Sequence, residues 1–242
     1  MKIVGIIPAR YNSSRFPGKP LLSLKGKSMI QRVYEGAKKS KNLSDLIVAT
    51  DDKRIFDEVV RFGGNVQMTS KKHNTGTDRC GEVSSKIDAD IIINIQGDEP
   101  LIDYRQLDQL CDVFNDEQVS IATLAIRCNS DEEKRNSNRV KIVLDKNSNA
   151  LYFSRSFIPN VINGEKSVLE KYDFYRHIGV YAYRRDTLLD LINLEKTLLE
   201  EIESLEQLRW LYNGYDIRIV KTTIESQNID VPEDVENVLK DL

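Results

Sequence analysis

Short apolar runs alternate with amphipathic helical patterns through the first half of this 242-residue chain, and the alternation restricts the fold strongly. The apolar runs are rich in Ile and Val and nearly continuous, as expected of strands buried on both faces. Strands and helices in alternation are typical of a parallel sheet covered by helices on both sides. The predicted strands span 2–9, 46–51, 65–70, 89–98 and 119–126, and the predicted helices 28–40, 54–63, 78–87 and 105–116.

The pattern changes after residue 126, where strand-like segments follow one another with few helices between them. They span 140–145, 150–159 and 174–185. We therefore expect an antiparallel extension over approximately 127–185. Helical patterns return at 186–195 and 198–214, the second with Leu205, Leu208 and Tyr212 on one apolar stripe, and are followed by a strand at 216–223 and a last helix near Pro232. With no linker or repeat along the chain, we predict a single α/β domain over 1–242.

Composition excludes several classes of protein. The net charge of −3 and the pI near 5.6 show none of the excess positive charge that is typical of nucleic-acid-binding proteins. No apolar run approaches the ~20 residues of a membrane span, so we expect a soluble, cytoplasmic protein without membrane insertion. Cys80, Cys111 and Cys128 are odd in number and widely spaced, as reduced structural thiols are. His73 and His177 are too few for a zinc site, so carboxylates must hold any metal.

The loop PARYNSSRFPGKP, directly after the first strand, carries three cations: Arg10, Arg15 and Lys19. Ligands of doubly wound sheets bind at the carboxyl ends of the strands, where this loop begins. Backbone N–H groups and the start of the next helix would add donors, and a polyphosphate is the anion that uses such a set. The alternative is a solvated basic loop. Neither the P-loop pattern nor G-x-G-x-x-G is present.

Three further positions each allow a functional and a structural interpretation. Asp98 ends a buried strand in NIQGDEP, where it suits a Mg²⁺ ligand or a turn. Asp230, in NIDVPEDV, precedes the last helix, and spacing alone favours a capping role. The loop HNTGTDR, at 73–79, suits a base or ribose contact, or a capped helix start at Thr77 or Asp78.

Taken in order, these loops and several further motifs closely resemble the 3-deoxy-manno-octulosonate (Kdo) cytidylyltransferase family, the CMP-Kdo synthetases of lipopolysaccharide synthesis. The matching stretches are IIPARYNSSRFPGKPL, IVATDD, HNTGTDR, NIQGDEPLI, NRVKIVLD, ALYFSRSFIP, YRHIGVYAYRR, LEQLRWLYNGY and IDVPEDVENV. The resemblance implies a Rossmann-like nucleotidyltransferase sheet and a homodimer formed through the antiparallel extension. It also implies that CTP and Kdo are the substrates and Mg²⁺ the cofactor.

The family's site residues fall on particular positions of this chain. The resemblance implies catalytic roles for Lys19, Arg10, Arg15 and Asp98. Nucleotide contacts are implied at Pro8, Ala9, Arg10, Arg15, Lys19, Thr75, Gly76, Thr77, Arg79, Gln96 and Asp98. Sugar-acid contacts are implied at Arg155, His177, Tyr181, Glu206 and Gln207. The implied metal ligands are Asp98 and Asp230, which replaces the capping interpretation of Asp230.

The implied reaction is attack by the anomeric 2-hydroxyl of Kdo on the α-phosphorus of CTP, with diphosphate leaving. Three alternatives remain open at this point. The acceptor could instead be 8-amino-Kdo or a sialic acid, because these sugars share the α-keto acid head. A regulatory protein that binds nucleotide without turnover is the third.

Overall fold

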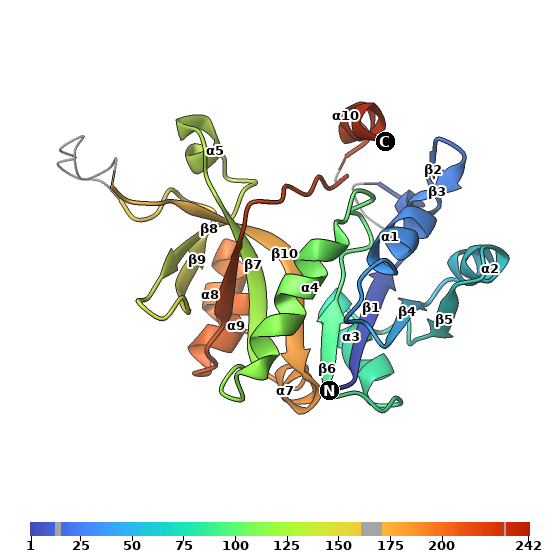
Figure 1. The fold of residues 1–242 in the computed structure, drawn as a ribbon, viewed down its shortest axis with the longest axis horizontal. Helices are drawn as coiled ribbons and strands as arrows, with labels where there is room; N and C mark the ends of the chain where they lie inside the picture. The colour runs from blue at the N-terminus through green and yellow to red at the C-terminus, as the bar shows by residue number, and fades with distance from the viewer. Residues whose placement is uncertain (13–15, 161–170, 230) are drawn as a thin grey trace.

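A nine-stranded sheet runs through the described part of the protein, in the strand order β11-β7-β10-β6-β1-β4-β5, with β8 and β9 attached beside β10 (Figure 1). The computed structural model describes residues 1–12, 16–160, 171–229 and 231–242. The strands are β1 (Ile3–Ala9), β4 (Asp45–Thr50), β5 (Asn65–Met68), β6 (Ile91–Asn94), β7 (Ile121–Arg127), β8 (Lys141–Leu144), β9 (Ala150–Ser154), β10 (Tyr175–Arg184) and β11 (Arg218–Thr222). A separate hairpin pairs β2 (Ser23–Leu24) with β3 (Lys27–Ser28).

Most neighbouring strands of the central sheet are parallel, as predicted. β1 pairs in parallel with β4 and β6, and its residue Ile6 lies opposite Ile47 and Asn94. β4 and β5 are parallel, as are β7 and β11. Only β10, among the strands on this path, runs against both of its neighbours, β6 and β7. The carboxyl ends of β1, β4 and β6 therefore meet at one edge, where ligands of such sheets bind.

Helices cover both faces of the sheet, so the predicted fold class is confirmed. One face packs on α1 (Met29–Ala37), α2 (Lys53–Arg61), α4 (Tyr104–Asp112) and α10 (Asp234–Asp241). The other packs on α3 (Gly76–Ser84), α7 (Arg185–Leu191), α8 (Leu198–Glu203) and α9 (Gln207–Tyr212). Alternate residues of β1 serve the two cores: Ile7 joins the first and Ile6 the second, and both are fully buried.

The predicted antiparallel extension is formed by α5 (Asp131–Arg135), β8, β9 and the first residues of β10. It projects from one end of the sheet (Figure 1). The strand expected at 174–185 has a second role that the sequence pattern did not indicate. After a bulge between Ile178 and Tyr181, β10 continues into the central sheet and separates β6 from β7. One strand thus joins the extension to the central sheet.

Two local predictions are wrong. The helix expected over 198–214 is divided at Ser204, whose φ of 52° lies in the left-handed region, and Tyr212 is 71% exposed instead of lying on the buried stripe with Leu205 and Leu208. The capped helix start falls on Thr75, two or three residues before the expected positions, because Thr75 and Asp78 form a reciprocal capping box. The three cysteines are free and buried, as predicted.

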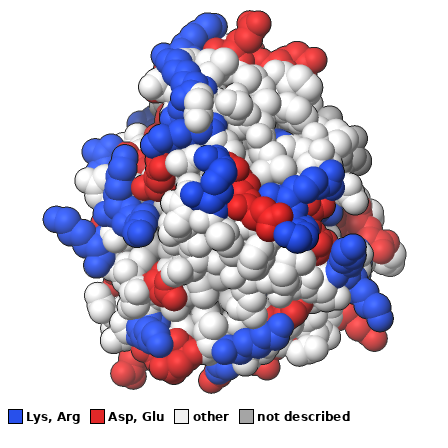
Figure 2. All heavy atoms as spheres, turned by 90° about the vertical axis from the view of Figure 1, so that its right-hand side faces the viewer, with Lys and Arg blue, Asp and Glu red and all other residues white. Residues whose placement is uncertain are grey.

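The surface carries charged side chains of both signs, as the nearly balanced charge of the sequence predicts. On the face that carries α2 and β5, Lys and Arg are interspersed with Asp and Glu (Figure 2). Across the described residues, no helix combines the length and the apolar character needed to cross a bilayer.

Candidate active site

A cavity of about 230 Å³ opens at the carboxyl ends of β1 and β6, beside the start of α3. Its walls come from three regions that are far apart in the sequence: the loop after β1, the segment around the start of α3 and the loop after β6. The lining residues are Pro8, Ala9, Arg10, Lys19, Pro20, His73, Asn74, Thr75, Gly76, Arg79, Gln96, Gly97 and Asp98. Most of the predicted nucleotide contacts are therefore brought together at the expected edge of the sheet, next to the N-terminus of a helix, where anions are favoured.

The floor of this cavity depends on a glycine. A Cβ at Gly97 would lie 2.9 Å from the backbone oxygen of Pro8, and one at Gly76 would lie 3.1 Å from the ring of Pro8. Backbone atoms cannot yield as a flexible side chain can, so any side chain at 97 would push the ends of β1 and β6 apart. The glycine in QGD is thus explained by close backbone approach.

Lys19 and Asp98 lie in direct contact at the mouth of the cavity. The Lys19 Nζ donates to Asp98 Oδ2 at 2.7 Å and to the Ile229 carbonyl, also at 2.7 Å. The Ile229 N–H in turn donates to the Asp98 carbonyl at 2.9 Å. The first loop, the end of β6 and the segment before α10 therefore converge on a single ammonium group.

The two acids of the motif NIQGDEP have different environments. Asp98 lines the cavity, and 26% of its side chain is exposed. Glu99 is buried, and burial, together with the neighbouring Asp98 charge, raises the pKa of Glu99 to about 8. Asp98 is consequently the carboxylate of this pair that a ligand in the cavity can reach.

Of the predicted metal pair, only Asp98 lies within the described residues. Asp230 and Arg15 lie outside the described residues, within which no group of three His, Cys, Asp or Glu side chains is placed to hold a metal ion. Oxygen atoms of Asp98 and Ile229 already share one cation, the ammonium of Lys19. Carboxylate and carbonyl oxygens are the protein ligands Mg²⁺ takes, so the donors described fit this ion.

Of the other predicted nucleotide contacts, Arg10 is exposed and lines the cavity, whereas Arg79 is buried. The Arg79 Nη2 donates to Asp51 Oδ2 at 2.9 Å, and Nη1 donates to the Thr69 hydroxyl. Breaking such a buried pair by removing one partner typically costs about 3–5 kcal/mol. Arg79 therefore joins the ends of β4 and β5 to α3 and forms part of the cavity wall.

Gln96 connects the cavity to β10. Its Nε2 donates to the Gly179 carbonyl at 2.9 Å. Two residues earlier on the same strand, His177 places its Nε2 2.9 Å from the Thr123 hydroxyl. Because Thr123 donates its own proton toward the Val180 carbonyl at 2.8 Å, its oxygen accepts from His177 Nε2–H, which assigns Nδ1 as an acceptor.

Burial lowers the pKa of His177 to about 3, so this imidazole is neutral near pH 7. It packs edge-on against Phe153, and its ring centroid lies 5.1 Å from that of Tyr181. Tyr181 is buried as well. The two predicted sugar contacts on β10 are neighbours, and His177 can serve a hydroxyl group as a neutral acceptor.

Glu206 joins the predicted sugar contacts to the predicted nucleotide contacts. Its Oε2 accepts from the Thr77 hydroxyl at 2.7 Å, and its Oε1 accepts from Arg209 Nη2 at 2.9 Å. Burial raises the pKa of Glu206, which these two bonds oppose. The adjacent Gln207 is buried at the start of α9.

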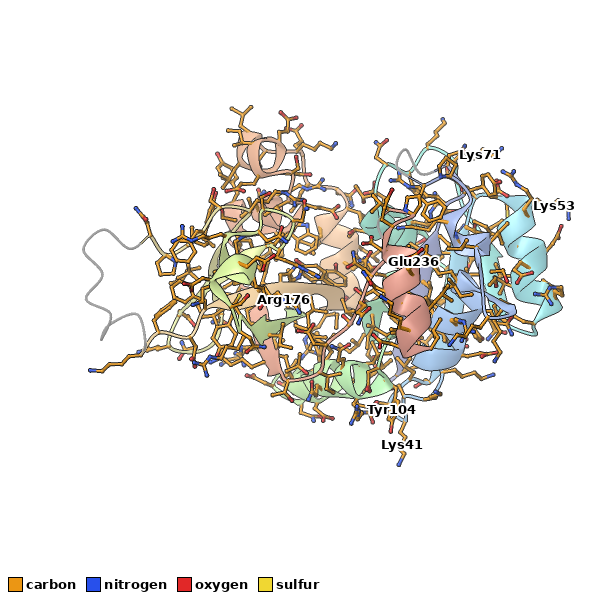
Figure 3. The ribbon with its side chains drawn as sticks, turned by 90° about the horizontal axis from the view of Figure 1, so that it is seen from above. Lys41, Lys53, Lys71, Tyr104, Arg176 and Glu236 are labelled. Atoms are coloured by element: carbon orange, nitrogen blue, oxygen red, sulfur yellow. The ribbon has the colours of Figure 1, made fainter. Side chains whose placement is uncertain are left out.

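Arg155, the remaining predicted sugar contact, lines a wide cleft of about 1140 Å³ between the extension and the C-terminal segment. Arg139 and Arg176 line the same cleft, as do Asn228 and Val231 on either side of Ile229–Asp230. Seen from above, Arg176 lies between the extension and α10, the helix that carries Glu236 (Figure 3). Three arginines and the segment bonded to Lys19 thus border one open space.

Sequence reasoning missed several residues of these walls. His73 lines the cavity, and its Nε2 lies 2.6 Å from Glu82 Oε2, an oxygen that also accepts from the Ser70 N–H. The Lys86 ammonium, followed by that N–H, lowers the pKa of Glu82 to about 2. In the sequence, the spacing of Glu82 and Lys86 on one face of the predicted helix indicates that these two side chains can pair. No pattern in the sequence singles out Asp51 or Arg139.

Comparison with known proteins agrees with the geometry. The profile of the cytidylyltransferase family matches residues 4–219. The 3-deoxy-manno-octulosonate cytidylyltransferase of Fusobacterium nucleatum is 50% identical over 242 residues, which cover 99% of this chain and 96% of the relative. That of Parabacteroides distasonis is 51% identical, covering 99% and 97%.

Solved structures extend the comparison to the backbone. A CMP:2-keto-3-deoxy-manno-octonic acid synthetase complexed with CTP has a TM-score of 0.93 and 43% identity, covering 99% of this chain and 98% of its own. A 4-diphosphocytidyl-2C-methyl-D-erythritol synthase from Anaerococcus prevotii, at 13% identity and a TM-score of 0.65, shares the fold alone. Sequence, backbone and cavity agree: this chain belongs to the 3-deoxy-manno-octulosonate cytidylyltransferase family.

Proposed function

We propose that the protein transfers the cytidylyl group of CTP to Kdo, giving CMP-Kdo and diphosphate. The anomeric 2-hydroxyl attacks the α-phosphorus, a new P–O bond forms, and the bond to the diphosphate breaks. The convergence of Lys19, Asp98 and the Ile229 carbonyl between the narrow cavity and the wide cleft carries this proposal. In this proposal, these groups bind the phosphate charge where the nucleotide and the acidic sugar meet.

The chain's own residues position the substrates and neutralise charge. Arg10 and Lys19 bind the triphosphate, and Lys19 stabilises the charge that develops on the leaving diphosphate. Thr75, Gly76 and Gln96 line the cavity for the cytidine. Of the arginines of the wide cleft, Arg176 is paired with Glu133 and Glu225, so Arg139 and Arg155 are the ones that bind the carboxylate of Kdo in this proposal.

Asp98 and Asp230 would hold a Mg²⁺ ion. When bound, this ion lowers the pKa of the attacking hydroxyl and compensates phosphate charge. Asp98 lines the cavity and would supply a carboxylate oxygen to the ion, while the buried Glu99 is not part of the lining.

The test of the proposed function is diphosphate release from CTP, measured with Kdo, 8-amino-Kdo and N-acetylneuraminate at equal concentration. Kdo should give the highest kcat/KM. A higher value with either analogue would identify that sugar as the acceptor. CTP binding by calorimetry without diphosphate release from any of the three would indicate a regulatory protein instead.

The geometry of His177 predicts a selective loss of sugar binding. His177→Ala removes an acceptor, and we expect the KM for Kdo to rise about tenfold, the effect of losing one hydrogen bond worth roughly 1.4 kcal/mol. The KM for CTP should stay within twofold of the wild type. His177→Asn, which keeps a polar atom near the Nδ1 position, should recover part of the loss. Equal effects on both KM values would contradict this role.

We also propose that the protein is a homodimer that uses the antiparallel extension, through β9, together with the adjoining helices α8 and α9. Four large apolar side chains of these elements are exposed: Leu151, Leu198, Ile202 and Tyr212, the last three by 71–81%. Exposed apolar side chains on elements that pack against one another, as α9 does against α8 and β9, are typical of a protein interface. Ile202→Lys should shift the mass measured by light scattering from dimer to monomer. Val60→Lys, on distant α2, alters another exposed apolar residue and should leave the dimer intact; a dimeric Ile202→Lys protein would refute this interface.

A further inference from the structure

The antiparallel extension contains a fully buried lysine, Lys141 on β8. Its Nζ donates to three backbone carbonyls: those of Asn136 at 2.8 Å, Arg139 at 2.5 Å and Arg155 at 2.7 Å. An ammonium group has three N–H donors, so each is used. A buried charge persists only where its donors are satisfied in this way.

The three residues that accept from Lys141 all line the wide cleft, whereas Lys141 does not. Two of them, Arg139 and Arg155, are cations of that cleft. The Arg155 Nη1 donates in addition to the Ser137 carbonyl at 3.3 Å, within the loop 136–139. The ammonium group of Lys141 therefore links the loop 136–139 to the end of β9 through hydrogen bonds.

Pairing with two strands fixes the backbone of Lys141. In the sheet register it lies opposite Ser154 of β9 on one side and Arg176 of β10 on the other. The side chain therefore starts from a rigid part of the extension, between the strands that carry two of the cleft's arginines. An interaction built on such strands can hold a loop within the few tenths of an ångström that a binding site requires.

We propose that Lys141 is a positioning residue for the acidic sugar: it sets the loop 136–139 and Arg155 as one wall of the sugar cleft. Lys141 touches neither substrate and acts only through the carbonyls it binds. This inference rests on the proposed function, with the wide cleft as the sugar side of the site.

The experiment compares Lys141→Met with the wild type and with Lys146→Met, a change of an exposed lysine in the next turn. Diphosphate release is measured while Kdo and CTP are varied separately. We expect the KM for Kdo to rise about tenfold in Lys141→Met, with the KM for CTP within twofold of the wild type. Lys141→Arg, which keeps the charge and the donors, should recover part of the sugar affinity. Lys146→Met should match the wild type in both.

Asn136→Ala covers the case in which Lys141→Met does not fold, detected as loss of CTP binding. Asn136 is exposed, and its side chain accepts the Asn138 N–H at 2.9 Å, which shapes the same loop. We expect a raised KM for Kdo alone, and partial recovery in Asn136→Ser, which keeps an oxygen for this turn.

Two results would overturn the role of Lys141. One is a KM for Kdo that stays within twofold of the wild type in the folded Lys141→Met protein. If Lys141→Met does not fold, the same result in Asn136→Ala takes its place. The other is an equal rise of both KM values. Failure of the proposed function is distinguishable, because the wild type itself would then release no diphosphate with Kdo.

Discussion

Replacing Asp98 by Asn should lower kcat by roughly 10²–10³-fold, the effect of removing one preorganised electrostatic contact from an active site. The change removes a charge and leaves the shape of the side chain. The amide oxygen introduced at position 98 would still accept from Lys19, and the backbone bond from Ile229 to residue 98 does not involve the side chain. The loss should therefore appear in turnover, while the melting temperature stays within a few degrees of the wild-type value.

The matched control for Asp98→Asn is Asp186→Asn, which removes a carboxylate that is 92% exposed, at the start of α7. This variant should retain full turnover. Initial rates of diphosphate release at several Mg²⁺ concentrations, with both substrates saturating, are the measurement. Wild-type turnover in Asp98→Asn at saturating Mg²⁺ would remove Asp98 from the catalytic machinery. A large loss of melting temperature would show that its role is structural.

The fold could be predicted largely because its signals are local. Runs such as KIVGIIPA are long, apolar and β-branched, and each strand of the central sheet was found within a few residues of its observed bounds. The break at Ser204 was missed because a left-handed serine has no sequence signature comparable to a glycine. The position of Tyr212 differs from the prediction for the same reason, since the helical pattern does not run unbroken through Ser204.

Less of the candidate site than of the fold could be predicted from the sequence, because the site depends on contacts between residues that are far apart along the chain. The sequence predicts that Lys19 lies in the loop after the first strand and that Asp98 ends another strand. It does not show that the ammonium of Lys19 binds Asp98, 79 residues further along the chain, and also donates to the carbonyl of Ile229, 210 residues further along. Lys141 is a stronger case. Its strand pattern, VKIVLD, gives no reason to expect a charge at full burial, because the three acceptors become visible only when β8, β9 and the loop 136–139 are assembled.

Removal of the Lys19 ammonium should weaken CTP binding and reduce turnover together, and it should change metal binding as well. In Lys19→Met we expect kcat to fall about 10²-fold and the KM for CTP to rise, because one donor to the triphosphate and to the leaving diphosphate is lost. The KM for Kdo should change little. The control, Lys53→Met, replaces a lysine whose side chain is 82% exposed on α2 and should behave as the wild type.

The metal effect follows from the contact between Lys19 and Asp98 at 2.7 Å. The ammonium of Lys19 is bonded to Oδ2 of Asp98, and its positive charge would repel a divalent cation on the same carboxylate. Lys19→Met should therefore bind Mn²⁺, used as a paramagnetic substitute for Mg²⁺, more tightly than the wild type when CTP is absent, as measured by electron paramagnetic resonance. Asp98→Asn should bind it more weakly in the same measurement. Equal Mn²⁺ affinity in Lys19→Met and the wild type would show that the ammonium and the metal ion do not compete for Asp98, and an unchanged CTP titration would remove Lys19 from the triphosphate site.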